Sequence, residues 1–247
     1  MNILLTNDDG IFAPGIAAAY KELVKLGDVI VVAPSGRMSG AGHSITVFEP
    51  LACEKINIED KFSGYSVSGS PADCVKLAIM ELCPKKPDLV VSGINHGANV
   101  GINVYYSGTV AAAMEAAFYR IPAIALSAAC EEQMDFKNAA KHCIAVMNKL
   151  LPVSSPGVIN INIPRLSQGE PKGVKVVPQS TCGFDEQYIP QKNEQGQTVF
   201  KLSGGQHRFE DDPADTTSLA EGFITVTPLI PDMTNHSKIN ELQKIKW

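Results

Sequence analysis

Short apolar runs alternate with amphipathic stretches along the first two thirds of the chain, and this alternation limits the fold more than any other feature of the sequence. Apolar runs suited to strands lie at residues 3–6, 29–33, 89–92, 123–127 and 158–163. Helical patterns lie between them, at residues 14–26, 71–82, 109–119 and 136–150. Strands that alternate with helices build a parallel sheet covered by helices on both faces. We therefore predict an α/β fold with a doubly wound, mostly parallel sheet.

Two regions depart from this pattern. Residues 45–68 alternate apolar and polar side chains at 45–47, 53–58 and 65–67, which favours an antiparallel insert. The tail is rich in Gly, Pro, Gln and charge, with strand patterns at 174–177, 199–202 and 223–227 and a closing helix within 232–247. It carries too little apolar periodicity for a core of its own. We predict a metal- and phosphate-binding core over residues 1–165, and over residues 166–247 β-hairpin extensions and an arm that pack on the core or on a partner subunit.

Charge and cysteine usage exclude several classes of function. The 247 residues carry a formal net charge of −5, whereas a long nucleic acid requires clustered Lys and Arg. The six cysteines form no CxxC pair and no zinc-ligand spacing with His, so we expect reduced thiols. No basic leader and no run of ~18 apolar residues is present. We expect a cytoplasmic protein with neither long nucleic acid nor a membrane as partner.

Polar, glycine-containing loops follow three of the predicted strands, at residues 7–10, 34–42 and 92–99. In a parallel sheet the carboxyl ends of the strands lie at one edge, and ligands bind there. We therefore expect these three loops to share one site.

Asp8 and Asp9 are the strongest chemical signal in these loops. Asp-Asp-Gly is also a good turn, and on the residues alone this alternative stays open. Two adjacent carboxylates that leave an apolar strand repel each other, and a bound cation relieves that repulsion. The Ser39 hydroxyl and the Asn95 side-chain oxygen complete an oxygen-only set, which selects one Mg²⁺ or Mn²⁺ per subunit rather than Zn²⁺. His96 is the softer alternative, although a loop histidine in contact with solvent or a carbonyl group is its more ordinary role.

A candidate phosphate site lies where the predicted helix 109–119 begins. Ser107, Gly108 and Thr109 lead into an Ala-rich stretch, and the free N–H groups of a helix N-terminus bind phosphate. N-capping alone explains Ser107 or Thr109, so the phosphate hypothesis depends on proximity to the metal loops. Ser39 and Gly40 are further candidates for phosphate contact, although a mobile surface loop would carry the same glycines.

Other polar residues have weaker signals. Ser70 and Asp73 predict a capped helix start, with Asp73 in a structural role. The acidic pair Asp211-Asp212 is more typical of a solvated loop. Spacing does not decide whether four further residues touch a substrate: Arg37, His207, Arg208 and His236.

Several long segments carry a family pattern in a fixed order. They are ILLTNDDG (3–10), APGI (13–16), APSGRMSGAGHSIT (33–46), GSPADCV (69–75), PDLVVSGINHGAN (87–99), YSGTVAAAME (106–115), NINIP (160–164), Asp215, GFITVTPL (222–229) and DMT (232–234). Together they resemble the survival protein E (SurE) family of 5'/3'-nucleotidases over nearly the whole chain. Residues 182–197 depart from the aromatic-rich family pattern, which leaves substrate selectivity open.

The resemblance implies a Rossmann-like core and a C-terminal oligomerisation arm exchanged between subunits of a homodimer or homotetramer. The metal ligands that it implies are Asp8, Asp9, Ser39 and Asn95. The phosphate contacts that it implies are Asn95, Ser107, Gly108 and Thr109.

We predict an enzyme, a metal-dependent phosphomonoester hydrolase that acts on nucleoside 5'- and 3'-monophosphates and on short polyphosphate. In this hypothesis Asp8 or Asp9 accepts the proton of the attacking water, and Asn95 and the helix start stabilise the transferring group. Formation of an aspartyl phosphate on Asp8 is the alternative. Two other functions stay open: a nucleotide or phosphate sensor without turnover, and a dinucleotide oxidoreductase, which the missing GxGxxG after the first strand disfavours.

Overall fold

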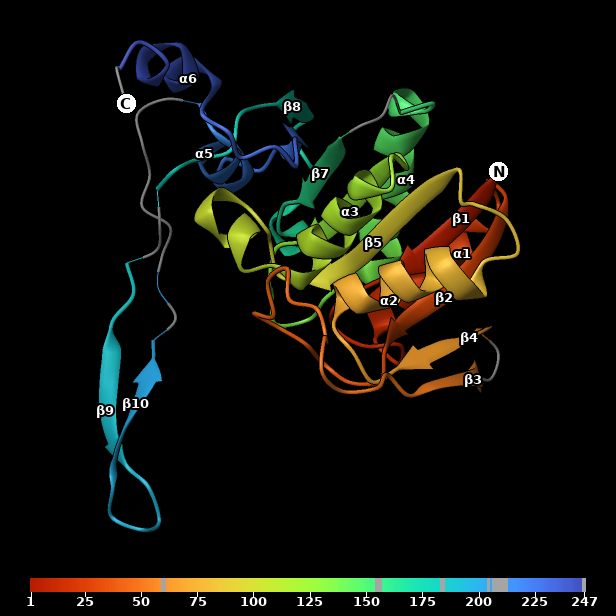
Figure 1. Cartoon of the computed structure of the whole chain (residues 1–247), viewed down its shortest axis with the longest axis horizontal. Coiled ribbons are helices and arrows are strands. Elements are labelled where there is room, and N and C mark those ends of the chain that lie inside the picture. Colours follow the sequence, from red (N-terminus) through yellow and green to blue (C-terminus); the bar gives the residue numbers. More distant parts are fainter. Residues whose placement is uncertain (59–60, 154–156, 183–184, 204, 206–212, 246–247) are drawn as a thin grey trace.

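The computed structural model describes residues 1–58, 61–153, 157–182, 185–203, 205 and 213–245. Its main sheet has nine strands in the order β3-β4-β2-β1-β5-β6-β7-β11-β8 (Figure 1). The strands of this sheet are β1 (Asn2–Thr6), β2 (Asp28–Pro34), β3 (Cys53–Ile58), β4 (Phe62–Val67), β5 (Leu89–His96), β6 (Ala123–Ala128), β7 (Val158–Ile163), β8 (Val174–Val176) and β11 (Ile224–Leu229). From β4 to β7 in this order, every neighbouring pair is parallel.

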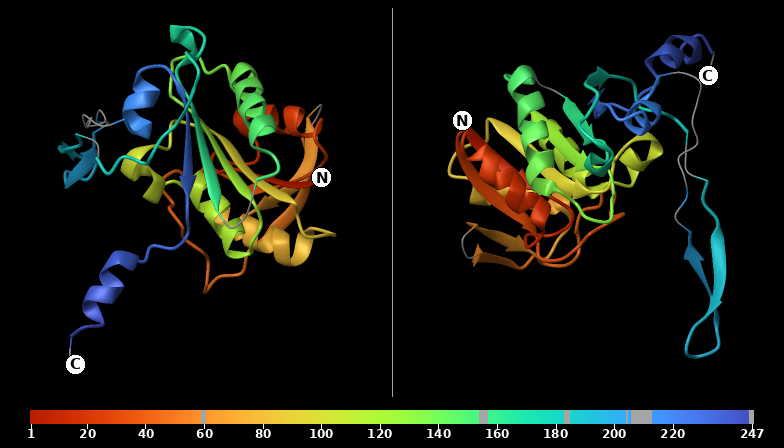
Figure 2. Two further views of the ribbon diagram at one scale, coloured as in Figure 1. Left: turned by 90° about the horizontal axis from the view of Figure 1, so that it is seen from above. Right: turned by 180° about the vertical axis from the view of Figure 1, so that it is seen from behind.

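Helices cover both faces of the sheet, as the alternating pattern predicts (Figure 2). One buried cluster joins Ile3 and Leu5 of β1 to α1 (Pro14–Leu23) and α4 (Phe136–Leu150). A second cluster joins Leu4 of β1 to α2 (Pro71–Leu77) and α3 (Gly108–Phe118) on the opposite face. Successive side chains of a strand point to opposite faces, so the apolar run of β1 contributes to both layers. The doubly wound α/β prediction is confirmed.

The position of β1 in the sheet defines where a ligand can bind. The chain leaves β1 through α1 to β2 on one side, and β5 later pairs with β1 on the other side. The order of strands therefore reverses between β1 and β5. In open α/β sheets, ligands bind outside the carboxyl ends of the strands at such a reversal.

The region at residues 45–68 differs in part from the prediction. β3 and β4 form the expected antiparallel pair, but β4 also pairs with β2 in parallel and so extends the main sheet. Residues 45–47 form no strand, which corrects the prediction there. Their backbone is bound to a side chain instead, because the N–H of Thr46 donates to Asp73 Oδ1 at 2.9 Å. The predicted helix 71–82 is α2 followed by a π-helical turn, Ala78–Leu82.

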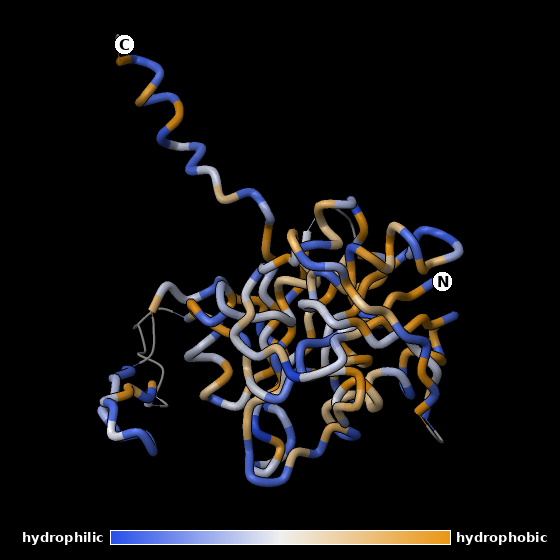
Figure 3. Tube along the Cα trace, turned by 60° about the horizontal axis from the view of Figure 1, so that its bottom comes forward, coloured by the Kyte–Doolittle hydropathy of each residue, from blue (hydrophilic) through white to orange (hydrophobic). Residues whose placement is uncertain are grey.

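The tail contributes both to the main sheet and to segments that project from it. β11 pairs with β7 in antiparallel fashion and β8 pairs with β11 in parallel, after the short helix η3 (Leu166–Gln168). β9 (Tyr188–Lys192), which the sequence pattern did not predict, forms a separate hairpin with β10 (Thr198–Leu202). α5 (Asp215–Ala220) precedes β11, and α6 (His236–Leu242) follows it. The hairpin and α6 project away from the sheet, and apolar and polar residues alternate along the C-terminal segment (Figures 1 and 3).

Within the described residues, no helix combines the length and the apolar character that crossing a membrane requires.

Candidate metal and phosphate site

The loop that follows β1 meets the carboxyl end of β5, which extends to His96, so residues 92–96 of the predicted loop 92–99 belong to the strand. The backbone N–H of His96 donates a hydrogen bond to Asp9 Oδ2 at 2.8 Å. The side-chain nitrogen of Asn95 donates to the carbonyl oxygen of Gly97 at 2.8 Å. The Asn95 side-chain oxygen is then the atom of this amide that is available to a ligand. The structure therefore brings Asp9 and Asn95 to one place.

The loop that follows β2 reaches the same edge. The N–H of Met38 donates to the carbonyl oxygen of Asp8 at 2.8 Å, so Ser39 follows directly after a residue bound to Asp8. Gly40 has a φ of +74°, and a Cβ atom added there would meet nothing within 4 Å. Gly40 thus lies in the predicted loop but faces open space. The segments that follow β1 and β2 and the end of β5 thus meet at one edge of the sheet, as the strand-end rule predicts.

The first turn of α3 contacts Asp8. Thr109 Oγ1 donates a hydrogen bond to Asp8 Oδ1. A Cβ atom on Gly108 would lie 2.9 Å from Asp8 Cβ, so this close approach requires glycine. Ser107 caps the helix by accepting from the N–H of Val110 at 3.1 Å, and its own hydroxyl proton remains for another acceptor. The candidate phosphate end of α3 and the candidate metal ligand Asp8 are therefore adjacent.

The surroundings of Asp8 oppose its negative charge. The residue is only 4% exposed, and burial raises the pKa of its carboxyl group. The hydrogen bond from Thr109 lowers this pKa in part, and the charge of Asp9 raises it again. A cation beside the two carboxylates would offset both the burial and the repulsion.

The donor atoms at this edge fit a hard divalent cation. They are two carboxylates, a hydroxyl and an amide oxygen, the ligand types that Mg²⁺ and Mn²⁺ prefer. Across the described ranges, no three His, Cys, Asp or Glu side chains gather as a possible metal cluster, so this part of the chain offers no site rich in nitrogen or sulfur ligands. Asn7 Oδ1, next to Asp8 in the chain, is a buried acceptor for which the described structure provides no partner. A water bound to a metal could satisfy such an acceptor.

The remaining candidates fall in different places. Arg37 Nη2 lies 3.2 Å from Asp9 Oδ1, at the site. The ring centroid of His96 lies 6.2 Å from that of Phe136, and only its backbone contacts Asp9. His236 pairs with Asp232 in the C-terminal segment, with Nε2 and Oδ2 2.8 Å apart. Three predictions lie outside the described residues: His207, Arg208 and the pair Asp211-Asp212.

Asp73 and Glu115 hold, from outside the site, the long loop that contains Ser39 and joins β2 to β3 (residues 35–52). The predicted capping box of α2 is confirmed, with Asp73 N–H bonded to Ser70 Oγ at 3.0 Å. Asp73 also accepts a hydrogen bond from the Thr46 hydroxyl at 2.7 Å, which anchors this loop. Glu115 of α3 lies 2.9 Å from His43 Nε2, within the same loop. Motif spacing could not predict these contacts, because each joins residues far apart in the chain.

Glu115 is a buried carboxylate with partners. Burial alone would raise the pKa of Glu115, but hydrogen bonds from His43 and Lys76 outweigh it and lower this pKa. Lys76 Nζ lies 3.1 Å from Glu115 Oε1. A single Glu within the Ala-rich stretch 110–117 is the sequence signal that could have indicated a paired charge here.

The segment between β5 and α3 is fixed by buried polar contacts. Asn99 N–H donates to Asn162 Oδ1 at 2.8 Å, and Asn160 Nδ2 donates to the Asn99 carbonyl oxygen at 2.8 Å. Asp215 Oδ2 accepts from the N–H of Gly101 at 3.0 Å, where the short helix η2 (Gly101–Tyr105) begins. Burial raises the pKa of Asp215, and bonds from backbone N–H groups oppose this effect. The tail thus holds the segment that leads to Ser107.

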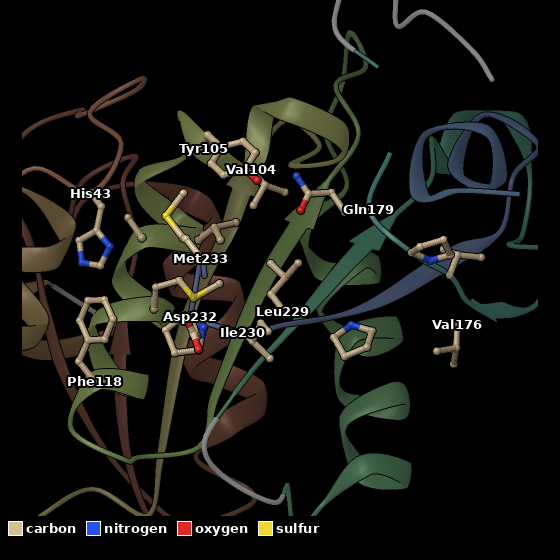
Figure 4. A pocket seen from close by; sticks show the side chains of 17 residues that line it. His43, Val104, Tyr105, Phe118, Val176, Gln179, Leu229, Ile230, Asp232 and Met233 are labelled. Atoms are coloured by element: carbon tan, nitrogen blue, oxygen red, sulfur yellow. The ribbon is translucent and has the colours of Figure 1, made fainter. Parts of the chain in front are cut away.

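A cavity of about 790 Å³ lies apart from the two carboxylates (Figure 4). One face of α3 lines it with Val110, Met114 and Phe118, and the end of β11 lines it with Leu229. His43 and Phe118 lie together on one side of it, with their ring centroids 5.3 Å apart. Its mostly apolar lining distinguishes it from the polar edge that holds Asp8.

Comparisons with known proteins show which family this chain resembles. The family described as "Survival protein SurE" matches residues 3–186. A 5'-nucleotidase SurE of Desulfitobacterium hafniense is 44% identical over 245 residues, which cover 99% of this chain and 96% of that protein. A 5'-nucleotidase SurE of Christiangramia forsetii is 44% identical over 246 residues, which cover 97% of this chain and 95% of that protein.

A solved structure shows the same architecture. The crystal structure of the SurE protein from Aquifex aeolicus matches with a TM-score of 0.83 and 38% identity, and the match covers 98% of each chain. Sequence, fold and the loops at the edge of the sheet all lead to one conclusion, namely that this chain belongs to the SurE family.

Proposed function

We propose that the chain is a divalent-metal-dependent nucleotidase that releases phosphate from nucleoside 5'- and 3'-monophosphates and from short polyphosphate. The single observation that carries this proposal is the contact between Thr109, at the N-terminus of α3, and the buried Asp8. It joins an acidic pair suited to a metal with a helix end suited to a phosphate. Relatives named 5'-nucleotidase SurE support the class of substrate.

The roles of the residues follow from their positions. Asp8, Asp9, Ser39 and Asn95 would hold one Mg²⁺ or Mn²⁺ per subunit. Such an ion supplies charge stabilisation on the phosphoryl oxygens and lowers the pKa of a bound water. The hydroxyl of Ser107 and the first N–H groups of α3 donate to the phosphate. Asp8 or Asp9 accepts a proton from water, and Asn95 orients the transferring group.

The test is phosphate release from 5'-AMP, 3'-AMP and short polyphosphate with EDTA, and then with Mg²⁺ or Mn²⁺ added back. We expect release only with metal. Tight binding of AMP without release of phosphate would overturn the proposed enzymatic activity and favour a nucleotide sensor. A phosphorylated enzyme trapped with labelled substrate would replace direct attack by water with an aspartyl phosphate.

We further propose that copies of this chain form a homodimer or homotetramer. α6 is exposed along its whole length, with Ile239 38% and Leu242 50% exposed. On the β9–β10 hairpin, Tyr188 is 67% and Phe200 64% exposed. A helix or hairpin this short is marginal in water without packing against another surface.

The oligomer is tested by light scattering on the eluting protein and on a Leu242→Glu variant. We expect the wild type to elute as a dimer or tetramer. We expect the variant to dissociate into monomers at protein concentrations at which the wild type is still an oligomer. Lys244→Glu, a charge change on the same segment without loss of an apolar side chain, is the matched control. A monomeric wild type would contradict the proposal.

A further inference from the structure

Asp9 has a partner on each of its carboxylate oxygens. Oδ2 accepts the backbone N–H of His96 at 2.8 Å, and Oδ1 lies 3.2 Å from Arg37 Nη2. The His96 N–H belongs to β5 and is held by the sheet. A cation that bound Asp9 through Oδ1 would compete with the guanidinium group of Arg37 for that oxygen.

Arg37 is suited to leave. Its side chain is 63% exposed, whereas that of Asp9 is 6% exposed. Ion pairs with an exposed partner contribute little to stability, and a divalent cation carries twice the charge of the guanidinium group. The contact with Asp9 is therefore weak enough to be exchanged for a metal ion.

The backbone keeps Arg37 at the site after its side chain has left Asp9. The next residue, Met38, stays bonded through its N–H to the carbonyl oxygen of Asp8. Arg165 also lies near this side of the site, because its Nε donates to the carbonyl oxygen of Cys130 at 3.0 Å and the Cys130 thiol donates to the carbonyl oxygen of His96 at 3.7 Å. α3 contacts Asp8 instead, through Thr109. A phosphate at the two carboxylates would thus have α3 beside Asp8 and Arg37 beside Asp9.

We propose that Arg37 exchanges counter-ions: it pairs with Asp9 in the metal-free protein and binds a phosphate oxygen of the nucleotide once metal occupies Asp9. The inference rests on the metal site of the proposed function. A guanidinium group carries parallel N–H donors that match two phosphate oxygens, and its charge does not depend on pH near neutrality. Arg37 then weakens metal binding in the absence of nucleotide and strengthens nucleotide binding in the presence of metal.

These two opposite effects define the experiment. Mn²⁺ binding to nucleotide-free protein is measured by calorimetry, and KM and kcat for 5'-AMP are measured at saturating Mn²⁺. We expect Arg37→Gln to bind Mn²⁺ about three- to tenfold more tightly, because a competing charge is gone. We expect its KM for 5'-AMP to rise about tenfold, because a charged hydrogen bond to phosphate is gone. Arg37→Lys should restore part of the lower KM.

Arg165→Gln is the matched control. It removes an equal charge near the site, from a side chain whose Nε donates to the Cys130 carbonyl oxygen at 3.0 Å rather than to Asp9. We expect its Mn²⁺ affinity to change by less than about twofold. If Arg165→Gln gained as much Mn²⁺ affinity as Arg37→Gln, the specific exchange at Arg37 would be overturned.

Three further results have distinct meanings. Unchanged or weaker Mn²⁺ binding in Arg37→Gln, with normal binding in the wild type, would overturn this inference alone. An unchanged KM would overturn the phosphate contact. Failure of the wild type to bind Mn²⁺ would overturn the proposed metal site and this inference together.

Discussion

Gly108 allows α3 to approach Asp8, and replacing it with alanine tests whether that closeness matters for catalysis. The added Cβ would lie 2.9 Å from Asp8 Cβ, 2.9 Å from Pro71 Cγ and 3.3 Å from Asp8 Oδ2. Carbon atoms in contact normally lie about 3.5–4.0 Å apart, so the helix and Asp8 must separate by roughly half an ångström or more. A misplacement of about 1 Å in a catalytic site can cost about 100-fold, and half of that predicts a loss of about tenfold in kcat.

The assay is steady-state release of phosphate from 5'-AMP, with Mn²⁺ affinity measured in parallel. Thermal unfolding checks the fold, because crowding costs about 1–3 kcal/mol while alanine favours the helix by about 1 kcal/mol. Gly36→Ala is the matched control, since a Cβ there would meet nothing within 4 Å. A Gly108→Ala enzyme with normal kcat and normal Mn²⁺ affinity would refute the reasoning.

Three carboxylates, Asp8, Asp9 and Glu115, give further predictions. Asp8→Asn and Asp9→Asn should abolish metal-dependent release of phosphate, and Mn²⁺ should raise the melting temperature of the wild type but not of either variant. Because burial raises the pKa of Asp8, the metal-free wild type should lose stability as the pH rises from the unfolded-state pKa of 3.8 through the folded-state pKa, and Asp8→Asn should lack this loss. If the free energy of unfolding, measured in EDTA, changed with pH in the same way in the wild type and in Asp8→Asn, this prediction would be contradicted. Glu115→Gln should lower the free energy of unfolding by about 1–3 kcal/mol at neutral pH, because it removes the charge that His43 and Lys76 contact. The pKa of Glu115 is lowered from 4.5, so this difference should shrink as the pH falls through the folded-state pKa, and a constant difference in denaturant titrations would argue against the pairing.

The central strands could be predicted because their cause is local. The runs that form β1 and β5 are apolar on both faces, and the helices between the strands carry amphipathic or Ala-rich patterns. Pairing partners are not local. Residues 65–67 alternate like an antiparallel strand, yet β4 pairs in parallel with β2 on one side and antiparallel with β3 on the other. Alternation reports which side of a strand is buried but not which strand lies next to it.

The candidate site, too, could be predicted from the sequence only in part. Asp8, Asp9 and Asn95 could be placed together because they lie at the carboxyl ends of two neighbouring parallel strands, β1 and β5. The contact of Thr109 with Asp8 required the actual approach of α3, which no spacing reveals. The sequence predicts that Asp73 is part of a helix cap, and only the fold shows that it also binds Thr46. The metal ligation of these residues remains a prediction.

Asp215 also bears on how the protein is made. The residues of the candidate site all come from the first half of the chain, whereas the carboxylate that holds Gly101 ahead of Ser107 comes from position 215. During synthesis on a ribosome, the amino-terminal strands can pair long before this carboxylate leaves the exit tunnel. The candidate site would therefore be completed late, so that an unfinished chain holds the acidic pair without the ordered segment that leads to α3.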